Sequence, residues 1–339
     1  MAMPGTDLET TGDRAPTELE VAGVVALADA SLSPATRRVY ASAWRTFEAW
    51  CGDVSRSALP ATPATLALYL AELVRRGRSV STVSTALASI GSKHAQAGLP
   101  DPTTDRAIRD IVKGARRTIG VAPRHQAHPL SVDELRRILA AIDRDGSLRG
   151  KRDSALLLLA FGAALRRSEL AALNVGDLSF AGGKGVVVTV RRAKADQEGK
   201  GALVAVQRGQ DPATDVVAAL RTWMAAATIA TTPDAPLFQP IAWSDRRVAL
   251  RRGAGGVPAM AHLTGEAVSS IMAARADAAG LGDLGVTGHS TRAGFVTAAG
   301  GRGVPIEQIA LVTRHRRMET VGIYLRPQSA MTAAPDLGL

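Results

Sequence analysis

The sequence predicts a mainly α-helical protein of two domains, with one small antiparallel β-sheet in the second domain. Three observations support this fold class. The length of 339 residues allows two domains of ordinary size. Apolar residues recur three and four positions apart over much of the chain, which is the period of a helix face. The composition is 46% hydrophobic but only 4% aromatic, and the strong helix formers Ala and Leu supply much of the apolar content.

The chain begins with a segment that predicts no stable structure. Residues 1–18 are rich in Thr, Gly, Pro and acidic residues and lack an apolar period, so we expect a disordered leader. Helical patterning begins near Leu19, and we predict that residues 19–117 form a helical bundle. Three helix starts in this domain carry a hydroxyl residue that can cap a helix, at Ser33, Thr62 and Ser79.

Residues 103–118 predict an amphipathic helix with one basic face. The basic residues that follow this face are Arg106, Arg109, Lys113 and Arg116. By itself, such a pattern more often marks a solvated charged face. The domain around it is strongly basic, however, so we expect this face to contact DNA phosphates.

Residues 118–130 contain two prolines and a glycine and show no periodicity, so we predict a linker between the domains. His125 and His128 lie in this segment at a spacing compatible with metal binding. No further Cys, His or carboxylate cluster has a matching spacing, so we expect loop histidines and no metal site.

Residues 131–339 are predicted to form the second domain. Ser131 and Glu134 match a capping box at the start of its first helix. A strongly apolar helical stretch follows at 152–173, and Arg166 lies inside it. The other elements that we expect are a hairpin of strands at 186–190 and 203–206, helices at 215–226 and 264–279, and a Gly-rich loop surrounded by Arg246, Arg247, Arg251 and Arg252. These arginines mark either a DNA-facing surface or an ordinary loop.

The net charge of +10 is unevenly distributed along the chain. Residues 1–20 carry one Arg and five acidic residues. Residues 21–130 carry 14 basic and 7 acidic residues, and residues 131–339 carry 26 and 19, so each of these two regions has a net charge of +7. Two basic domains suit a polyanionic partner, and nucleic acid is the commonest one.

The composition and the apolar runs argue against a secreted or membrane-spanning protein. A single cysteine, Cys51, excludes an intrachain disulfide and favours an intracellular setting. The longest apolar run, residues 155–165, is too short to cross a bilayer, and the N-terminus lacks the pattern of a secretory signal.

Arg166 is the first candidate for chemistry, because its apolar surroundings make an unpaired guanidinium costly. Glu169, three residues later, is the obvious partner. The pair has two interpretations. It is either a structural ion pair, which this segment alone favours, or a contact that holds Arg166 in place so that its guanidinium can bind an oxyanion.

A second group of candidates lies near the C-terminus. His289 and Arg292 are three residues apart at an expected helix start, which itself favours an anion. Gly288 and Gly294 beside them permit a close backbone approach. His315 and Tyr324 complete the group. Cationic donors in a cluster can grip a phosphate, and a tyrosine among them can attack it.

In this combination and order the motifs resemble those of the tyrosine recombinase (phage integrase) family. The segment A-L-R-R-S-E-L resembles the first arginine box, H-S-T-R the second box, and T-R-H-R-R-M-E-T-V-G-I-Y the third. Two positions depart from the usual pattern, because Ala164 and Arg314 stand where the family usually has glycine. The catalytic residues that the resemblance implies are Arg166, Lys194, His289, Arg292, His315 and Tyr324, with Glu169 in support.

The resemblance covers residues 20 to 330 approximately, and it implies a fold and an activity. The fold is a SAM-like core-binding helical domain followed by a catalytic domain. The activity is site-specific DNA recombination, in which Tyr324 forms a 3′-phosphotyrosyl link without a metal or a cofactor. Lys194, just beyond the first strand of the hairpin, would protonate the leaving 5′-oxygen, and this place favours it over Lys184 and Lys200, which lie near the same hairpin.

The partners that the resemblance implies are double-stranded DNA with specific recombination sites and three further copies of the chain. We expect a homotetramer on DNA, a monomer in solution, no membrane association, and a cytoplasmic location at the nucleoid. Three alternatives remain open: a type IB topoisomerase-like enzyme, a non-catalytic DNA-binding regulator, and a phosphatase or nuclease. The target site, and whether the protein integrates, excises or resolves DNA, are not encoded in any pattern that we recognise.

Overall fold

The computed structural model describes residues 17, 32–120, 126–191, 201–246, 248–252, 258–315 and 321–322. The chain divides into two compact units, Met1–Arg124 and His125–Leu339. Apart from Thr17, the leader expected at residues 1–18 lies outside the described residues. The following paragraphs treat each unit by itself.

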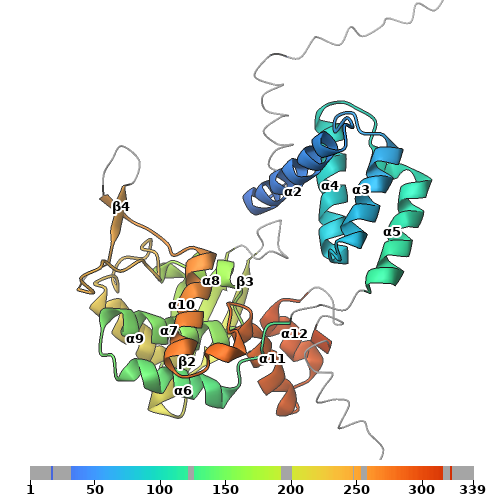
Figure 1. Ribbon diagram of the computed structural model, residues 1–339. Helices are drawn as coiled ribbons and strands as arrows, with labels where there is room; N and C mark the ends of the chain where they lie inside the picture. Colours follow the sequence, from blue (N-terminus) through green and yellow to red (C-terminus); the bar gives the residue numbers. More distant parts are fainter. Residues whose placement is uncertain are drawn as a thin grey trace, which may run out of the picture. The chain divides into compact units, whose positions relative to one another are not determined.

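The described residues of the first unit form a bundle of four helices (Figure 1). They are α2 (Pro34–Asp53), α3 (Pro63–Arg75), α4 (Val80–Gln96) and α5 (Arg106–Ile119). The predicted caps are confirmed, because the side chains of Ser33, Thr62 and Ser79 each accept a hydrogen bond from the backbone N–H three residues later. Helix α5 continues to Ile119, which packs on the core, and ends at Gly120 with φ 77°. The first two residues of the segment predicted to be a linker are therefore helical.

Helix α5 has an apolar side that packs on the core of this bundle and a basic side that is exposed. Ile108 is 1% exposed and packs with Phe47, Leu66 and Leu70 from α2 and α3. The four basic residues predicted to meet DNA, Arg106, Arg109, Lys113 and Arg116, are all exposed. The amphipathic pattern thus gives an exposed basic side on a helix whose other side packs on the core.

Where the structure describes it, the second unit is mostly helical, with two small sheets. Its helices are α6 (Val132–Asp143), α7 (Leu148–Gly162), α8 (Arg167–Ala171), α9 (Val216–Ala226), α10 (Gly265–Ala278), α11 (Ser290–Gly301) and α12 (Ile306–Thr313). Its strands are β1 (Leu178–Ala181), β2 (Gly185–Val190), β3 (Ala202–Gln207), β4 (Leu250–Arg252) and β5 (Pro258–Met260). The capping box predicted at the start of α6 is confirmed, since Ser131 and Glu134 exchange both of its hydrogen bonds.

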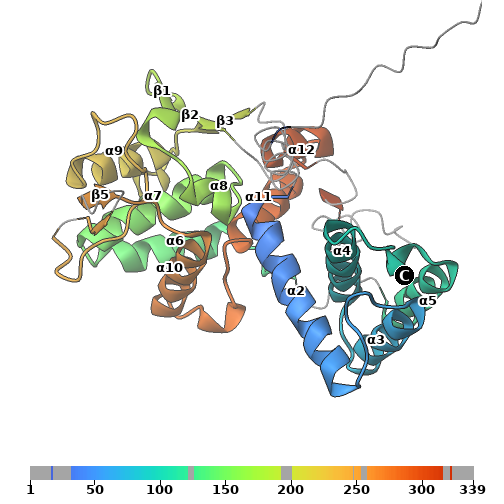
Figure 2. The same ribbon diagram turned by 90° about the horizontal axis from the view of Figure 1, so that it is seen from above.

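The first sheet is antiparallel in the order β1-β2-β3 (Figure 2). Val188 pairs with Leu178 on one side and Val204 on the other. The predicted hairpin is confirmed in β2 and β3. Strand β1 was not expected, although its residues alternate between partly buried and exposed before the Gly182-Gly183 turn.

A second sheet lies where no strand was expected, on either side of the Gly-rich loop that the arginines surround, and residues 253–257 of that loop lie outside the described residues. Strands β4 and β5 form an antiparallel pair there, with Leu250 opposite Met260. Strands of three residues are too short to be revealed by hydrophobic periodicity.

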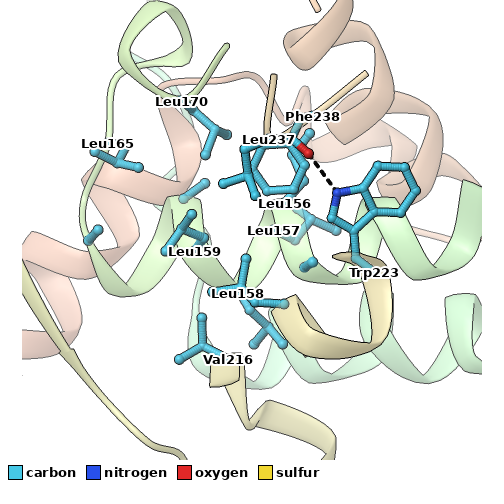
Figure 3. Close-up of a cluster of buried hydrophobic side chains, with 14 of the residues drawn as sticks. Leu156, Leu157, Leu158, Leu159, Leu165, Leu170, Val216, Trp223, Leu237 and Phe238 are labelled. Carbon is cyan, nitrogen blue, oxygen red and sulfur yellow. Dashed lines mark hydrogen bonds between the residues drawn. The ribbon is translucent and has the colours of Figure 1, made fainter. Parts of the chain in front are cut away.

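Helix α7 is the axis of the second unit's core. Leu156, Leu157 and Leu159 are fully buried, because other elements cover the helix on several sides. Among the covering side chains, Trp223 of α9 donates its indole N–H to the carbonyl of Leu237 at 2.7 Å (Figure 3). The hydrogen bond lets a large aromatic side chain lie entirely inside the core.

The apolar stretch at 152–173, expected to be one helical run with Arg166 inside it, is in fact broken. Helix α7 ends at Gly162, Ala164 has a left-handed φ of 47°, and α8 begins at Arg167. Arg166 is the N-cap of α8, and its backbone N–H donates to Glu169 at 3.0 Å. The carboxylate therefore stabilises a new helix start at a place where hydrophobic periodicity shows no interruption.

Gly294 fixes the position of α11 in this unit. A Cβ atom at Gly294 would overlap the backbone of Leu130, and the N–H of Leu130 donates to the carbonyl of Ser290 at 3.0 Å. Gly288 is similarly close to Arg167 and Ser269. The close approach predicted for both glycines is confirmed.

We expect Gly294→Ala to lower the free energy of unfolding by about 1–3 kcal/mol, because α11 must move away from Leu130 to admit the methyl group. Urea denaturation followed by circular dichroism measures this change. The control is Gly114→Ala in α5, where a Cβ meets no atom within 4 Å. There the better helix propensity of alanine should leave stability equal or raise it by up to about 1 kcal/mol. Equal stability of Gly294→Ala and the wild type would contradict the packing argument.

Candidate functional site

Four of the predicted site residues come together in the second unit, although they belong to three distant segments. Arg166 lies between α7 and α8, His289 and Arg292 at the start of α11, and His315 two residues beyond the end of α12. The four residues are close enough to interact electrostatically, since the charges of Arg166, His289 and Arg292 all act on His315. Lys194 and Tyr324 lie outside the described residues.

The ends of two helices meet at this site. Helix α7 ends in the turn that contains Ala164, with φ 47°, and helix α12 ends at Arg314, with φ 55°. The last carbonyl groups of a helix have no partner within it and carry the negative end of the helix dipole. Two sets of carbonyl oxygens thus point toward the place where the arginines lie.

Arg292 joins these two helix ends. It is 4% exposed, and its guanidinium donates to the carbonyl of Ala164 at 2.7 Å and to the carbonyl of Thr313. Arg166 donates to the carbonyl of Arg314 at 3.4 Å. The arginines therefore satisfy carbonyl groups that would otherwise be buried without donors, and these contacts hold each guanidinium in place.

The two non-glycine residues at these turns adopt the conformation that glycine adopts easily. Ala164 and Arg314 are also the two positions at which the motifs depart from their usual glycine. A left-handed backbone costs a residue with a side chain about 1–2 kcal/mol. Contacts of the surrounding side chains must offset this cost.

Glu169 is the acceptor at the centre of the site. Its side chain is 1% exposed and receives the guanidinium of Arg166 at 2.6 Å, the amide of Arg166 at 3.0 Å, and the guanidinium of Arg314 at 2.8 Å. The structural ion pair between Arg166 and Glu169 is therefore present. It also leaves the Arg166 side chain 16% exposed, so an anion can reach it.

The pKa of Glu169 lies below its ordinary value. Burial by itself would raise this pKa, but the positive charges of Arg314 and Arg166 and the hydrogen bond from the Arg166 amide outweigh it. Glu169 is thus a permanent anion near neutral pH, which compensates part of the positive charge of the arginines.

Arg314 is a site residue that sequence reasoning missed. The sequence shows an arginine in place of a glycine, which raises only a question about the backbone. Its side chain contacts Glu169, 145 positions earlier in the chain, and no spacing rule connects residues so far apart. The one available signal was that Glu169, if buried, could balance the charge of more than one arginine.

His315 is oriented by a short chain of hydrogen bonds. The hydroxyl of Thr313 lies 2.7 Å from the carbonyl of Ile309, to which it donates, and also 2.7 Å from Nδ1 of His315. Since the hydroxyl has one proton, Nδ1 of His315 is the donor in the second contact. In the neutral ring Nε2 then carries the lone pair.

Burial, followed by the charges of Arg292, Arg166, Arg314 and His289, lowers the pKa of His315 to about 4. The ring is therefore neutral at pH 7, and its Nε2 is an acceptor until an anion arrives. Since the unfolded chain binds this proton more readily, the histidine reduces stability as the pH falls through the interval between its unfolded pKa, about 6.5, and 4.

The arrangement can bind an anion through fixed cationic donors. His289 is exposed at the start of α11, Arg292 is buried beside it, and Arg166 is accessible at its edge. Among the described residues, no three His, Cys, Asp or Glu side chains are grouped in a way that could hold a metal ion. The basic face of α5 belongs to the other unit and is exposed.

A sequence model of the phage integrase family matches residues 128–331. An integrase/recombinase XerD homologue of Selenomonas ruminantium is 31% identical over 293 residues, which cover 86% of this chain and 81% of the relative. The recombinase Cre of Escherichia phage P1 is 25% identical over 316 residues, which cover 90% of this chain and 87% of that protein.

Two solved structures share the fold. The XerH site-specific recombinase bound to a palindromic difH substrate, in a post-cleavage complex, matches with a TM-score of 0.56 and 18% identity over 82% of this chain and 73% of that one. A lambda integrase tetramer bound to a Holliday junction matches with a TM-score of 0.57 and 14% identity over 88% and 74% of the two chains.

We expect Glu169→Gln to lower the free energy of unfolding by about 3 kcal/mol at pH 7, because two buried guanidinium groups lose their anion. A carboxylate whose pKa is depressed on folding stabilises above its unfolded pKa, about 4.3, and loses this effect as the pH falls through the folded pKa. Urea denaturation across pH 3–8 should therefore show the two proteins converging at low pH.

The matched control is Glu266→Gln, since Glu266 is 79% exposed and lies 3.7 Å from Arg167. This variant should differ from the wild type by less than about 0.5 kcal/mol at every pH. A difference between Glu169→Gln and the wild type that does not change with pH would mean that the lost charge is not its cause.

Proposed function

The chain belongs to the phage integrase family, and we propose that it cleaves and rejoins DNA through a 3′-phosphotyrosyl link formed by Tyr324. Membership follows from the family match over residues 128–331 and from a relative that is 31% identical over 86% of the chain. The protein is a site-specific DNA recombinase. The assignment of individual residues is the proposal, and one observation supports it above all: Arg166, His289, Arg292 and His315 converge from three segments of one unit.

The proposed nucleophile needs a cationic environment. A free tyrosine has a pKa near 10, so at pH 7 only about one molecule in a thousand is the phenolate. Nearby positive charges lower this pKa. Arg166 and Arg292 are held by carboxylate and carbonyl acceptors before any substrate arrives. Donors fixed in this way stabilise a five-coordinate phosphorus without reorganising during the reaction.

The residues of the site account for the bonds formed and broken and for both proton transfers in the reaction. The Tyr324 oxygen attacks the phosphorus, and the bond from phosphorus to the 5′-oxygen breaks. The phosphate keeps its bond to the 3′-oxygen of the DNA and is now also bonded to the tyrosine. We assign the tyrosine proton to His289 and the proton taken up by the leaving 5′-oxygen to Lys194. One phosphoester replaces another, so a 5′-hydroxyl of a second strand can reverse the step without an energy source.

His315 has a defined task in this scheme. Its neutral ring leaves Nε2 unprotonated at pH 7, whereas a nearby phosphate favours the protonated ring. We propose that His315 becomes a hydrogen-bond donor to the phosphate as DNA binds. The tautomer fixed by Thr313 places the new proton on Nε2.

DNA is the partner of the chain, and the protein assembles on it. We propose a homotetramer on two specific sites and a monomer in free solution. The lambda integrase relative with the same fold is a tetramer bound to a Holliday junction. We assign the basic face of α5, comprising Arg106, Arg109, Lys113 and Arg116, to contacts with the DNA backbone.

We place the protein in the cytoplasm at the nucleoid, because its substrate is DNA. Within the described part of the chain, no helix combines the length and the apolar character needed to cross a membrane. The relatives that match most of the chain are recombinases or integrases. No observation favours the topoisomerase, regulator or phosphatase alternatives.

We expect Tyr324→Phe to form no covalent adduct with DNA, since phenylalanine lacks the attacking oxygen. The substrate is a nicked duplex that carries a site selected from random sequences by the purified protein, and the adduct is detected on a denaturing gel. The control, Tyr40→Phe, changes another tyrosine of the chain and should form the adduct at the wild-type rate. An adduct with Tyr324→Phe would refute the assignment of the nucleophile.

We expect Lys194→Ala to slow cleavage by about a hundredfold or more, because the leaving oxygen lacks its proton donor. A substrate with a 5′-bridging phosphorothioate should restore most of the rate, since a thiolate leaves without a proton. Lys184→Ala, an exposed lysine beside the same hairpin, is the control and should cleave both substrates at the wild-type rate. Equal defects of Lys194→Ala on both substrates would exclude the general-acid role.

A further inference from the structure

Arg314 has a side chain that spans three segments of the second unit. It directly follows α12, and its side chain is only 8% exposed. The guanidinium donates to the carbonyl of Val312 at 2.7 Å and more weakly to the carbonyls of Ala163 and Ala164, at 3.4 and 3.3 Å. It also reaches Glu169 at 2.8 Å. One side chain thus connects the ends of α12 and α7 with the start of α8.

Arg314 also contacts Arg166 from two directions. The two guanidinium groups divide the Glu169 carboxylate, with Arg166 on Oε1 and Arg314 on Oε2. In addition, Arg166 donates to the backbone carbonyl of Arg314 at 3.4 Å. The position of Arg166 therefore depends on Arg314 through the shared carboxylate and through the turn that Arg314 occupies.

The backbone at Arg314 shows that the side chain serves the site. With φ 55°, this is a position that glycine occupies with less strain. A glycine would leave the Glu169 Oε2 atom with the Arg166 amide as its one remaining partner among the described residues. The backbone at Arg314 is therefore strained, but this residue supplies a guanidinium group that glycine lacks.

We propose that Arg314 is a positioning residue that fixes Arg166 relative to His315, so that the phosphate donors have their spacing before DNA binds. The inference rests on the proposed strand-cleavage function and deepens it. His315 directly follows Arg314 in the chain, so the turn that Arg314 holds also carries the histidine. Arg314 itself donates to carboxylate and carbonyl oxygens of the protein and acts through its neighbours.

The test compares Arg314→Met, Arg314→Lys and the wild type in a single-turnover assay of adduct formation. We expect Arg314→Met to lower the maximal rate by about tenfold to a hundredfold, as small displacements of catalytic groups do. The DNA concentration that gives half the maximal rate should change by less than about twofold, because Arg314 does not bind the phosphate. Arg314→Lys retains a charge at Glu169 and should recover part of the rate.

The control is Arg144→Met. Arg144 is exposed, and its guanidinium donates to the carbonyl of Ala140 in its own helix. This variant should match the wild type in both the maximal rate and the DNA dependence. A variant of Arg314 that weakens DNA binding but keeps the maximal rate would show that Arg314 contacts DNA directly, and would overturn the positioning role.

Arg314→Gly separates positioning from simple filling of space. Glycine relieves the backbone strain, so this variant should fold even if Arg314→Met does not, and thermal unfolding checks this. The proposal requires a slow maximal rate in a folded Arg314→Gly protein. A wild-type rate in that protein would overturn the proposal, since the site would then need only the backbone conformation.

A double-mutant cycle with Glu169→Gln tests the route through the carboxylate. If Arg314 acts through Glu169, Arg314→Gly should slow the Glu169→Gln protein less than it slows the wild type. Equal effects in both backgrounds would refute this route. An absent adduct in the wild type would instead defeat the proposed function itself, whereas a normal adduct with unimpaired Arg314 variants defeats the positioning role alone.

Discussion

One buried carboxylate shared by two guanidinium groups is the interaction on which the site depends. An arginine side chain stays charged at any pH at which the protein folds, so burying it requires acceptors. Glu169 supplies them to Arg166 and Arg314, and the free ends of α7 and α12 supply carbonyl oxygens to Arg166, Arg292 and Arg314. The same contacts that satisfy the charges also fix the directions in which the guanidinium groups point.

The fold creates this acceptor set by ending two helices at one place. Helix α7 is covered by apolar side chains along its length, so its end has a fixed position. Helix α11 packs against Leu130 through Gly294, which brings Arg292 to the end of α7, and α12 lies beside α11 (Figure 1). The carbonyl groups at these helix ends have no partner within their own helices, so they can accept hydrogen bonds from the arginines of the site.

This arrangement explains why two strained turns persist. Ala164 and Arg314 hold left-handed conformations without glycine, and the carbonyl groups of both turns accept hydrogen bonds from site arginines. Strain of this kind persists where the surrounding structure determines the backbone more strongly than local preference does. For strand cleavage, the consequence is a set of donors that is in place before the substrate enters.

The sequence by itself determined the elements that depend on near neighbours. Hydroxyl caps at Ser33, Thr62 and Ser79, the capping box at Ser131, and the hairpin of β2 and β3 arise from interactions within a few residues, so they were readable. The pairing of Arg166 with Glu169 and the grouping of His289 with Arg292 follow from helical spacing in the same way. The recombinase family was evident because its motifs keep their order along the chain. The domain boundaries, the DNA contacts of α5 and the catalytic roles of all the candidate residues stay predictions.

Only the tertiary structure decided the remaining features. The break after α7 and the contact between Arg314 and Glu169 depend on segments that are distant in sequence. Periodicity shows no interruption at Ala164, because the backbone there is set by side chains from α11 and α12. The tautomer of His315 likewise follows from where the single proton of Thr313 points. Local patterns encode helices and their caps, whereas the sharing of buried charges is settled only when the helix ends meet.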